Sequence, residues 1–172
     1  MDILLKIVAD GFVVLVVLIG AYALLRYVPN DKRYQAYAKI LMAGLTAYAV
    51  AKIAGLLYQP TGQRPFEELG VEAGASFLNN PGFPSDHALF TMAITLAVWF
   101  TTKNKLFSSI LLGLTLAVGI GRIIALVHTP LDVAGGLLIA CVGIFWYLLP
   151  STMREGTKKS TRKKVARENN KQ

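Results

Sequence analysis

Long apolar runs recur along this chain and limit, more than any other feature, what it can fold into. They lie at about residues 7–28, 40–58, 87–102, 106–127 and 131–149. Each is close to the roughly 20 residues that a helix needs to cross the hydrocarbon core of a bilayer. Because 54% of the residues are hydrophobic and 16% are charged, an ordinary soluble domain is not expected. The sequence therefore predicts an all-α, polytopic transmembrane helix bundle with about five spans.

The basic residues are concentrated in the last part of the chain. The net charge is +8, and residues 151–172 alone carry eight Lys or Arg against Glu155 and Glu168. The remaining chain is close to neutral, so binding to nucleic acid is not indicated. We predict a transmembrane domain at residues 1–150 and a basic cytoplasmic tail at 151–172 that lies on anionic lipid headgroups.

Short loops rich in Lys and Arg predict the orientation, because such loops stay on the cytoplasmic side. The basic residues fall between the first two runs, between the third and fourth, and after the fifth: Arg26, Lys32, Arg33, Lys39, Lys103, Lys105 and the tail. Five alternating crossings place all three groups on one side. We expect a cytoplasmic C-terminus, with the N-terminus and residues 59–84 facing outward. The first run must also accommodate Asp10 near one end.

The outward segment 59–84 is long for a connection between neighbouring helices. Within it, Phe66–Leu78 has scattered apolar positions with acids between them, which suits a short helix lying at the membrane interface. Residues 79–82, Asn-Asn-Pro-Gly, are typical of a turn. We therefore expect a short, outward-facing interfacial helix between the second and third spans.

Pro84-Ser85-Asp86-His87 is a polar cluster at the start of the third run. Proline followed by serine predicts a helix start with Ser85 as N-cap. The free backbone N–H groups of such a start favour an anion. His87, in the first turn, is placed to donate a proton to a departing oxygen. The alternative is an ordinary capping motif with an interfacial histidine, and this cluster alone does not decide between the two.

A second polar cluster consists of Arg122, His128 and Asp132. On a straight helix, six residues place Arg122 about 9 Å from His128, within reach of a guanidinium suited to phosphate oxygens. Thr129-Pro130 predicts the start of the fifth span, with Asp132 in its first turn. A carboxylate that orients one imidazole nitrogen leaves the other as a base or nucleophile. The alternative is a structural Arg–Asp ion pair beside an uninvolved histidine. Ionisable groups in membrane spans are costly, and this favours function.

These two clusters resemble two signatures of the type 2 phosphatidic acid phosphatase superfamily, which also includes vanadium haloperoxidases. The usual forms are P-S-G-H and S-R-x5-H-x3-D, so Asp86 replaces glycine and Gly121 replaces serine here. The usual first signature, K-x6-R-P, would begin at Lys52, yet Gln59-Pro60 follows at that spacing. Arg64-Pro65 comes five residues later, and we interpret this as an insertion with Arg64 supplying the guanidinium.

The resemblance implies a two-step hydrolysis without a metal or other cofactor. His128 would attack phosphorus, Asp132 would orient it, and His87 would protonate the leaving group. The phosphoryl oxygens would be held by Lys52, Arg64 and Arg122. Ser85 and Asp86, in the second signature, would complete the phosphate-binding set. The implied substrate is a lipid phosphate or diphosphate, and the P-S-D-H form favours undecaprenyl diphosphate, cleaved at the outer face of the cell membrane.

Four other functions remain open from the sequence. A phospholipid phosphatase acting on phosphatidylglycerol phosphate or phosphatidic acid would use the same residues, as would a lipid phosphotransferase. A small proton-coupled carrier or channel would instead spread ionisable groups through the membrane depth, whereas here they gather at one face. A scaffold docked through the basic tail is the least favoured, because cytoplasmic anchoring already accounts for that tail.

Overall fold

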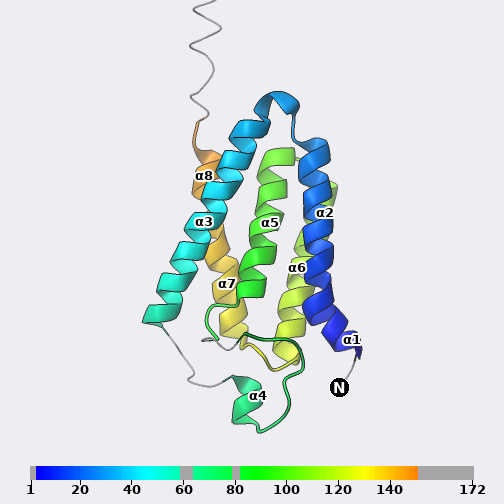
Figure 1. The fold of residues 1–172 in the computed structure, drawn as a ribbon, viewed down its shortest axis with the longest axis vertical. Coiled ribbons are helices and arrows are strands. Elements are labelled where there is room, and N and C mark those ends of the chain that lie inside the picture. Colours follow the sequence, from blue (N-terminus) through cyan, green and yellow to red (C-terminus); the bar gives the residue numbers. More distant parts are fainter. Residues whose placement is uncertain (1–2, 59–63, 79–81, 151–172) are drawn as a thin grey trace, which may run out of the picture.

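The computed structural model describes residues 3–58, 64–78 and 82–150. Every regular element in these residues is a helix, which confirms the predicted fold class (Figure 1). In chain order the elements are α1 (Ile3–Lys6), the π-helix η1 (Ile7–Gly11), α2 (Phe12–Tyr27), the 3-10 helix η2 (Asn30–Lys32), α3 (Arg33–Leu57), α4 (Pro65–Glu68), α5 (Asp86–Thr102), α6 (Lys105–Ile124), α7 (Pro130–Val142) and α8 (Ile144–Leu148). The predicted tail, 151–172, lies outside the described residues.

Four continuous helical stretches in the described residues are long and apolar enough to cross a membrane. They are Ile3–Tyr27, Asn30–Leu57, Lys105–Ile124 and Pro130–Leu148, and they correspond to the first, second, fourth and fifth predicted spans. The predicted third span is α5, whose 17 residues extend about 26 Å, slightly less than the hydrocarbon thickness. Because α5 lies in the middle of the bundle, protein rather than lipid covers much of it (Figure 1).

The central helix α5 packs against α2, α3, α6 and α7. Its buried face contains apolar residues and two threonines, Thr91 and Thr95. Each threonine hydroxyl donates to a carbonyl one turn earlier, and Thr95 Oγ1 also lies 3.0 Å from Thr115 Oγ1 on α6. These threonine hydroxyls are therefore satisfied within the protein, as a membrane environment requires.

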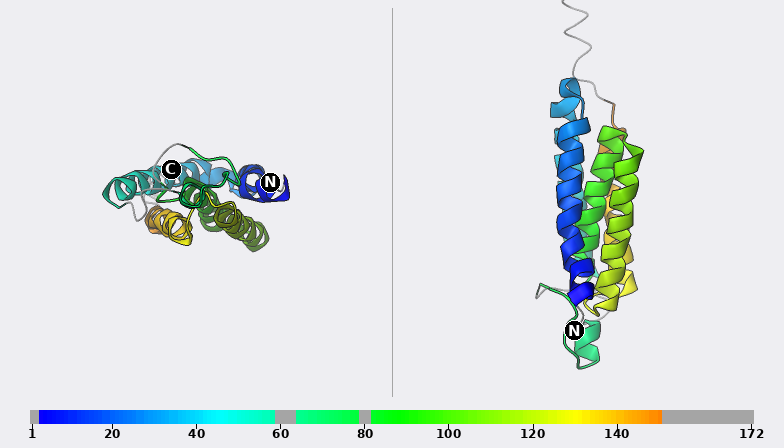
Figure 2. Two further views of the ribbon diagram at one scale, coloured as in Figure 1. Left: turned by 90° about the horizontal axis from the view of Figure 1, so that it is seen from below. Right: turned by 90° about the vertical axis from the view of Figure 1, so that its right-hand side faces the viewer.

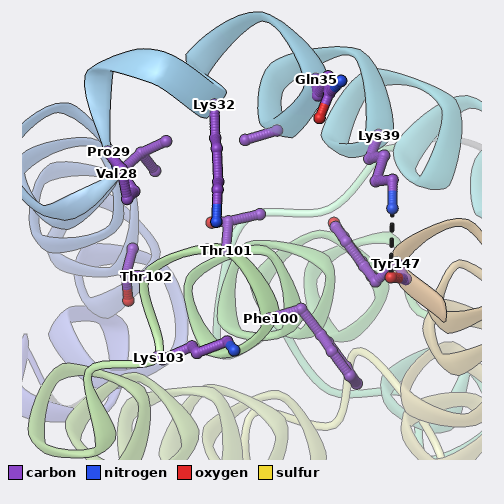
Figure 3. Close-up of a pocket in the computed structure, with 11 residues that line it drawn as sticks. Val28, Pro29, Lys32, Gln35, Lys39, Phe100, Thr101, Thr102, Lys103 and Tyr147 are labelled. Carbon is purple, nitrogen blue, oxygen red and sulfur yellow. Dashed lines mark hydrogen bonds between the residues drawn. The ribbon is translucent and has the colours of Figure 1, made fainter. Parts of the chain in front are cut away.

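The two ends of the bundle differ in character (Figures 1 and 2). We call one the histidine end, because α3 and α6 end there and α5 and α7 begin there with His87 and His128 nearby. The other, the lysine end, has a cavity of about 280 Å³ (Figure 3). This cavity is lined by Val28, Pro29, Lys32, Gln35, Ala36, Lys39, Phe100, Thr101, Thr102, Lys103 and Tyr147. Lys32, Lys39 and Lys103, three of the basic residues predicted to share one membrane face, thus lie at one end of the bundle.

The connection between α3 and α5 contains a helix that is shorter than the predicted interfacial one. The helix is α4, Pro65–Glu68, and it does not extend to Leu78. Gly70 has a left-handed φ of 66°, which ends the helix. Gly74 then donates its N–H to Ala125 O at 2.9 Å, and a Cβ at Gly74 would lie 2.6 Å from Ala125 Cα. The segment therefore packs onto the end of α6. Most of the turn predicted at 79–82 lies outside the described residues.

Candidate active site

His128 lies in a loop and not on the helix that carries Arg122. Helix α6 ends at Ile124, whereas the apolar run predicted a span reaching Val127. Leu126 has a left-handed φ of 59°, and it redirects the chain so that His128 is buried with 5% of its surface exposed. The spacing argument based on a straight helix was therefore wrong. The loop, not the helix, brings His128 back toward the bundle.

Helix α7 begins with a reciprocal cap that places Asp132 beside His128. Thr129 Oγ1 accepts from Asp132 N at 3.2 Å, and Asp132 Oδ2 accepts from Thr129 N at 2.8 Å. Pro130 occupies the first helical position, as predicted. The same Oδ2 lies 3.6 Å from His128 Nδ1, longer than a formed hydrogen bond. Catalytic contacts of this kind are often long before substrate binds.

Arg64 is brought to the backbone of the His128 loop. The residue is 7% exposed, and Nη1 donates to Val127 O at 2.6 Å while Nη2 donates to Leu78 O at 3.0 Å. Its backbone N–H donates to Glu67 Oε2, which caps α4. Arg64, which follows Lys52 at an unusual spacing, thus contacts Val127, the residue before His128. Gln59, the alternative position, lies outside the described residues, so the insertion remains a prediction.

The start of α5 is fixed against the start of α7. Ser85 caps α5, as predicted, with Oγ accepting from Ala88 N at 3.5 Å. Its own N–H donates to Asp132 O at 2.9 Å. A Cβ at Gly136 would lie 2.5 Å from Ser85 O, so only glycine permits this approach of α7 to α5. The arrangement holds His87, in the first turn of α5, at the same end as His128.

Lys52, on α3, reaches toward the start of α5. Its Nζ lies 3.3 Å from Asp86 Oδ1 and 4.9 Å from the centre of the Tyr48 ring. The Lys52 and Asp86 side chains are 46% and 33% exposed, so this pair contributes little to stability. The effect of the pair is to fix the position of the Lys52 ammonium group. The carboxylate that stands where the family commonly has glycine holds the lysine of the first signature.

Arg122 has a partner that the sequence did not reveal. Its side chain is 1% exposed, and Nη1 donates to Asp10 Oδ1 at 2.8 Å. Asp10 belongs to the π-helix η1, 112 residues earlier in the chain. Arg122 Nε is buried without a partner in the described part of the chain. The only local hint was the presence of a carboxylate in an apolar run, where a charge needs a partner.

Electrostatic interactions join these groups into one cluster. The charges of Arg122, Asp10 and His128 act on His87, although all three residues lie outside α5. His128 interacts with Arg122 and Arg64. Burial lowers the pKa of His128, the Asp132 contact opposes this, and the two arginines lower the pKa further. The His128 imidazole is therefore neutral at neutral pH, which is the form that a nucleophile needs.

Three curated relatives resemble this chain. YbjG of Escherichia coli (strain K12) is 34% identical over 113 residues, which cover 63% of this chain and 54% of that protein. The undecaprenyl-diphosphatase BcrC of Bacillus subtilis (strain 168) is 29% identical over 125 residues, covering 70% and 62%. The bacitracin transport permease protein BcrC of Bacillus licheniformis is 34% identical over 112 residues, covering 62% and 52%. The chain thus spans between half and two thirds of each relative, and no solved structure matches it.

The family model of the PAP2 superfamily matches residues 36–154. The match contains every residue of the two polar clusters, together with Lys52 and Arg64. It agrees with the resemblance carried by those signatures and with the geometry that gathers them at the histidine end. It begins after α2, so it leaves out the helix that carries Asp10. The chain belongs to the PAP2 superfamily.

Proposed function

We propose that this protein is an integral membrane lipid phosphatase that cleaves undecaprenyl diphosphate to the monophosphate and inorganic phosphate. The observation that carries the proposal is the convergence of a buried, neutral His128 with Asp132, Arg64 and Arg122 at one end of a membrane-spanning bundle. The substrate follows from BcrC of Bacillus subtilis, which is named as an undecaprenyl-diphosphatase. The chemistry follows from what phosphoryl transfer needs: fixed positive charge and a positioned nucleophile.

In the proposed first step, His128 Nε2 attacks the terminal phosphorus, because Nδ1 faces Asp132. The bond from phosphorus to the bridging oxygen breaks, and His87, which takes up a proton when the negatively charged diphosphate binds, gives that proton to the departing lipid monophosphate. In the second step, His87 takes a proton from water, which attacks the phosphohistidine and releases phosphate. Arg64, Arg122 and Lys52 hold the phosphoryl oxygens, together with backbone N–H groups in the first turn of α5, because the Ser85 N–H itself donates to Asp132 O. These cations supply the charge stabilisation that a metal would otherwise provide.

We place the histidine end at the outer face of the membrane and the lysine end at the cytoplasmic face. The support is the clustering of Lys32, Lys39 and Lys103 around the cavity at the lysine end (Figure 3), because basic residues mark the cytoplasmic side. On this reading, the site faces the leaflet in which an outward-facing lipid diphosphate presents its headgroup. The C-terminal tail then lies near cytoplasmic anionic headgroups.

Phosphate release from the purified full-length protein tests this function. The panel contains undecaprenyl diphosphate, phosphatidic acid and phosphatidylglycerol phosphate, each assayed with and without excess EDTA. We expect the diphosphate to be turned over fastest and EDTA to leave the rate unchanged. Faster turnover of either phospholipid would replace the substrate. Transfer of phosphate to an added lipid alcohol would make the protein a phosphotransferase. A loss of rate with EDTA that magnesium restores would refute the metal-independent mechanism.

The interrupted first signature makes a separate prediction. Arg64→Ala should lower turnover of lipid diphosphate by about 100-fold, because it removes a charge-assisted phosphate contact and a support of the His128 loop. Gln59→Ala is the matched control and should stay within about twofold of wild type. Steady-state phosphate release at saturating substrate measures both. If Gln59→Ala loses most of its turnover while Arg64→Ala keeps the wild-type rate, the insertion interpretation is wrong.

A further inference from the structure

The N-terminal helix supplies a carboxylate to the candidate site. Asp10 lies in the π-helical turn η1, outside the segment that the family model matches. Its Oδ1 accepts from Arg122 Nη1 at 2.8 Å, and its Oδ2 accepts from Ser76 N at 3.0 Å. One side chain thus joins the first span, the end of α6 and the segment after α4. Irregular π-helical turns within α-helices are frequent at functional sites.

Asp10 restrains an arginine that the rest of the site leaves without a hydrogen bond. In the described part of the chain, Asp10 is the hydrogen-bond partner of the Arg122 side chain, while Arg64 has two backbone carbonyls. A guanidinium is planar and carries five N–H donors. Binding Asp10 through Nη1 fixes its plane and leaves other donors for an anion, among them the buried Nε.

The approach of Asp10 depends on Gly121, the residue before Arg122. A Cβ at Gly121 would lie 3.1 Å from both Cα and N of Ala9, the backbone next to Asp10. Contacts this short require the neighbour to move, and here the neighbour is backbone rather than a flexible side chain. The family signature usually has serine at this position. The glycine removes a hydroxyl from the site and lets η1 come close enough for Asp10 to reach Arg122.

We propose that Asp10 is a positioning residue of the phosphate site, and that glycine at position 121 is what allows it to reach Arg122. Asp10 sets the orientation of Arg122, and through Ser76 it restrains the segment leading to Leu78, whose carbonyl accepts from Arg64. The N-terminal helix is thereby part of the catalytic unit. The proposal rests on the proposed function, because it assumes that Arg122 binds a phosphoryl group.

Orthovanadate, a mimic of the phosphoryl group, tests the proposal without relying on turnover. Its affinity is measured by thermal stabilisation of the full-length protein in detergent, for wild type, Asp10→Asn, Asp10→Glu and Asp31→Asn. Asp31 is exposed in η2 at the lysine end and provides the matched control. We expect Asp10→Asn to bind vanadate about tenfold more weakly, Asp10→Glu to recover part of the loss, and Asp31→Asn to match wild type.

A pair of glycine variants tests whether the close approach of η1 to Gly121 is needed for vanadate binding. Gly121→Ala should weaken vanadate binding by about the same factor as Asp10→Asn, because it moves η1 away. Gly113→Ala makes the same change on the same helix, where a Cβ would meet nothing within 4 Å, and should leave the affinity unchanged. If Asp10→Asn does not fold, Asp10→Glu and this pair decide the question. Equal vanadate affinity in Gly121→Ala and Gly113→Ala would overturn the proposal.

Kinetics on lipid diphosphate separate positioning from a merely structural role. We expect Asp10→Asn to lower kcat about tenfold or more with a smaller change in KM, since the held guanidinium matters most as charge builds in the transition state. Wild-type protein that binds vanadate but releases no phosphate from any lipid would refute the proposed function and leave the Asp10 result standing. Wild-type turnover with unchanged vanadate affinity and kcat in Asp10→Asn would refute the Asp10 proposal alone. Wild type that does neither would refute both.

Discussion

Replacing His128 with alanine is expected to lower phosphate release from lipid diphosphate by about 10⁴-fold or more. The proposed mechanism passes the phosphoryl group through this imidazole, and the chain has one other histidine, His87. The fold should survive, because His128 Nδ1 has no hydrogen-bond partner among the described residues and Asp132 keeps its bond to Thr129 N. Phosphate release, with size-exclusion chromatography in detergent as the check on folding, measures the result.

The matched variant for this experiment is His87→Ala. Both variants remove an imidazole from the same end of the bundle, but only His128 is proposed to bond to phosphorus. With substrate labelled at the terminal phosphate and an alkaline quench, wild type and His87→Ala should retain label on protein, whereas His128→Ala should retain none. Turnover that persists in His128→Ala, or label that persists there, would remove His128 as the nucleophile.

Local sequence signals predicted the helix starts of the site. Ser85 after a proline and Thr129 before Pro130 satisfy N–H groups within one turn of themselves, and both caps are present. Length and hydropathy likewise predicted four of the five spans, because a bilayer requires about 20 apolar residues whatever their neighbours are. Helix caps, which depend on a few consecutive residues, and span lengths, which depend on bilayer thickness, could therefore be predicted from the sequence.

Features set by packing between distant segments were not accessible. Hydropathy extended α6 to Val127 because Ala125 and Val127 are apolar, but these residues leave the helix and pack with Ala9 and Ala75 in a small core at the histidine end. Phe66 joins the same core, so its segment does not form the interfacial helix over Phe66–Leu78 that its apolar positions indicated. In a membrane protein, hydropathy does not distinguish burial in lipid from burial in protein.

The pairing of Asp10 with Arg122 shows the same limit within the site itself. The sequence contained both clues, a carboxylate in the first apolar run and glycine where the family usually has serine. Their connection became visible only when η1 was seen to pack on Gly121. Asp132, by contrast, was placed beside His128 from sequence, because four residues across a helix start leave little freedom.

Asp132→Asn should lower turnover by about 100-fold or more while leaving thermal stability close to wild type. The amide oxygen can still accept from Thr129 N, so the start of α7 is preserved. What is lost is the negative charge 3.6 Å from His128 Nδ1, which stabilises the positive ring that forms as Nε2 bonds to phosphorus. Thr129→Ala should do the reverse: losing the cap hydroxyl costs about 1 kcal/mol of stability, and turnover stays within a few-fold because the carboxylate remains. Thermal unfolding and phosphate release on the two variants measure both effects. If Asp132→Asn loses activity only in proportion to a fall in its melting temperature, the carboxylate is a helix cap and not the partner of the nucleophile.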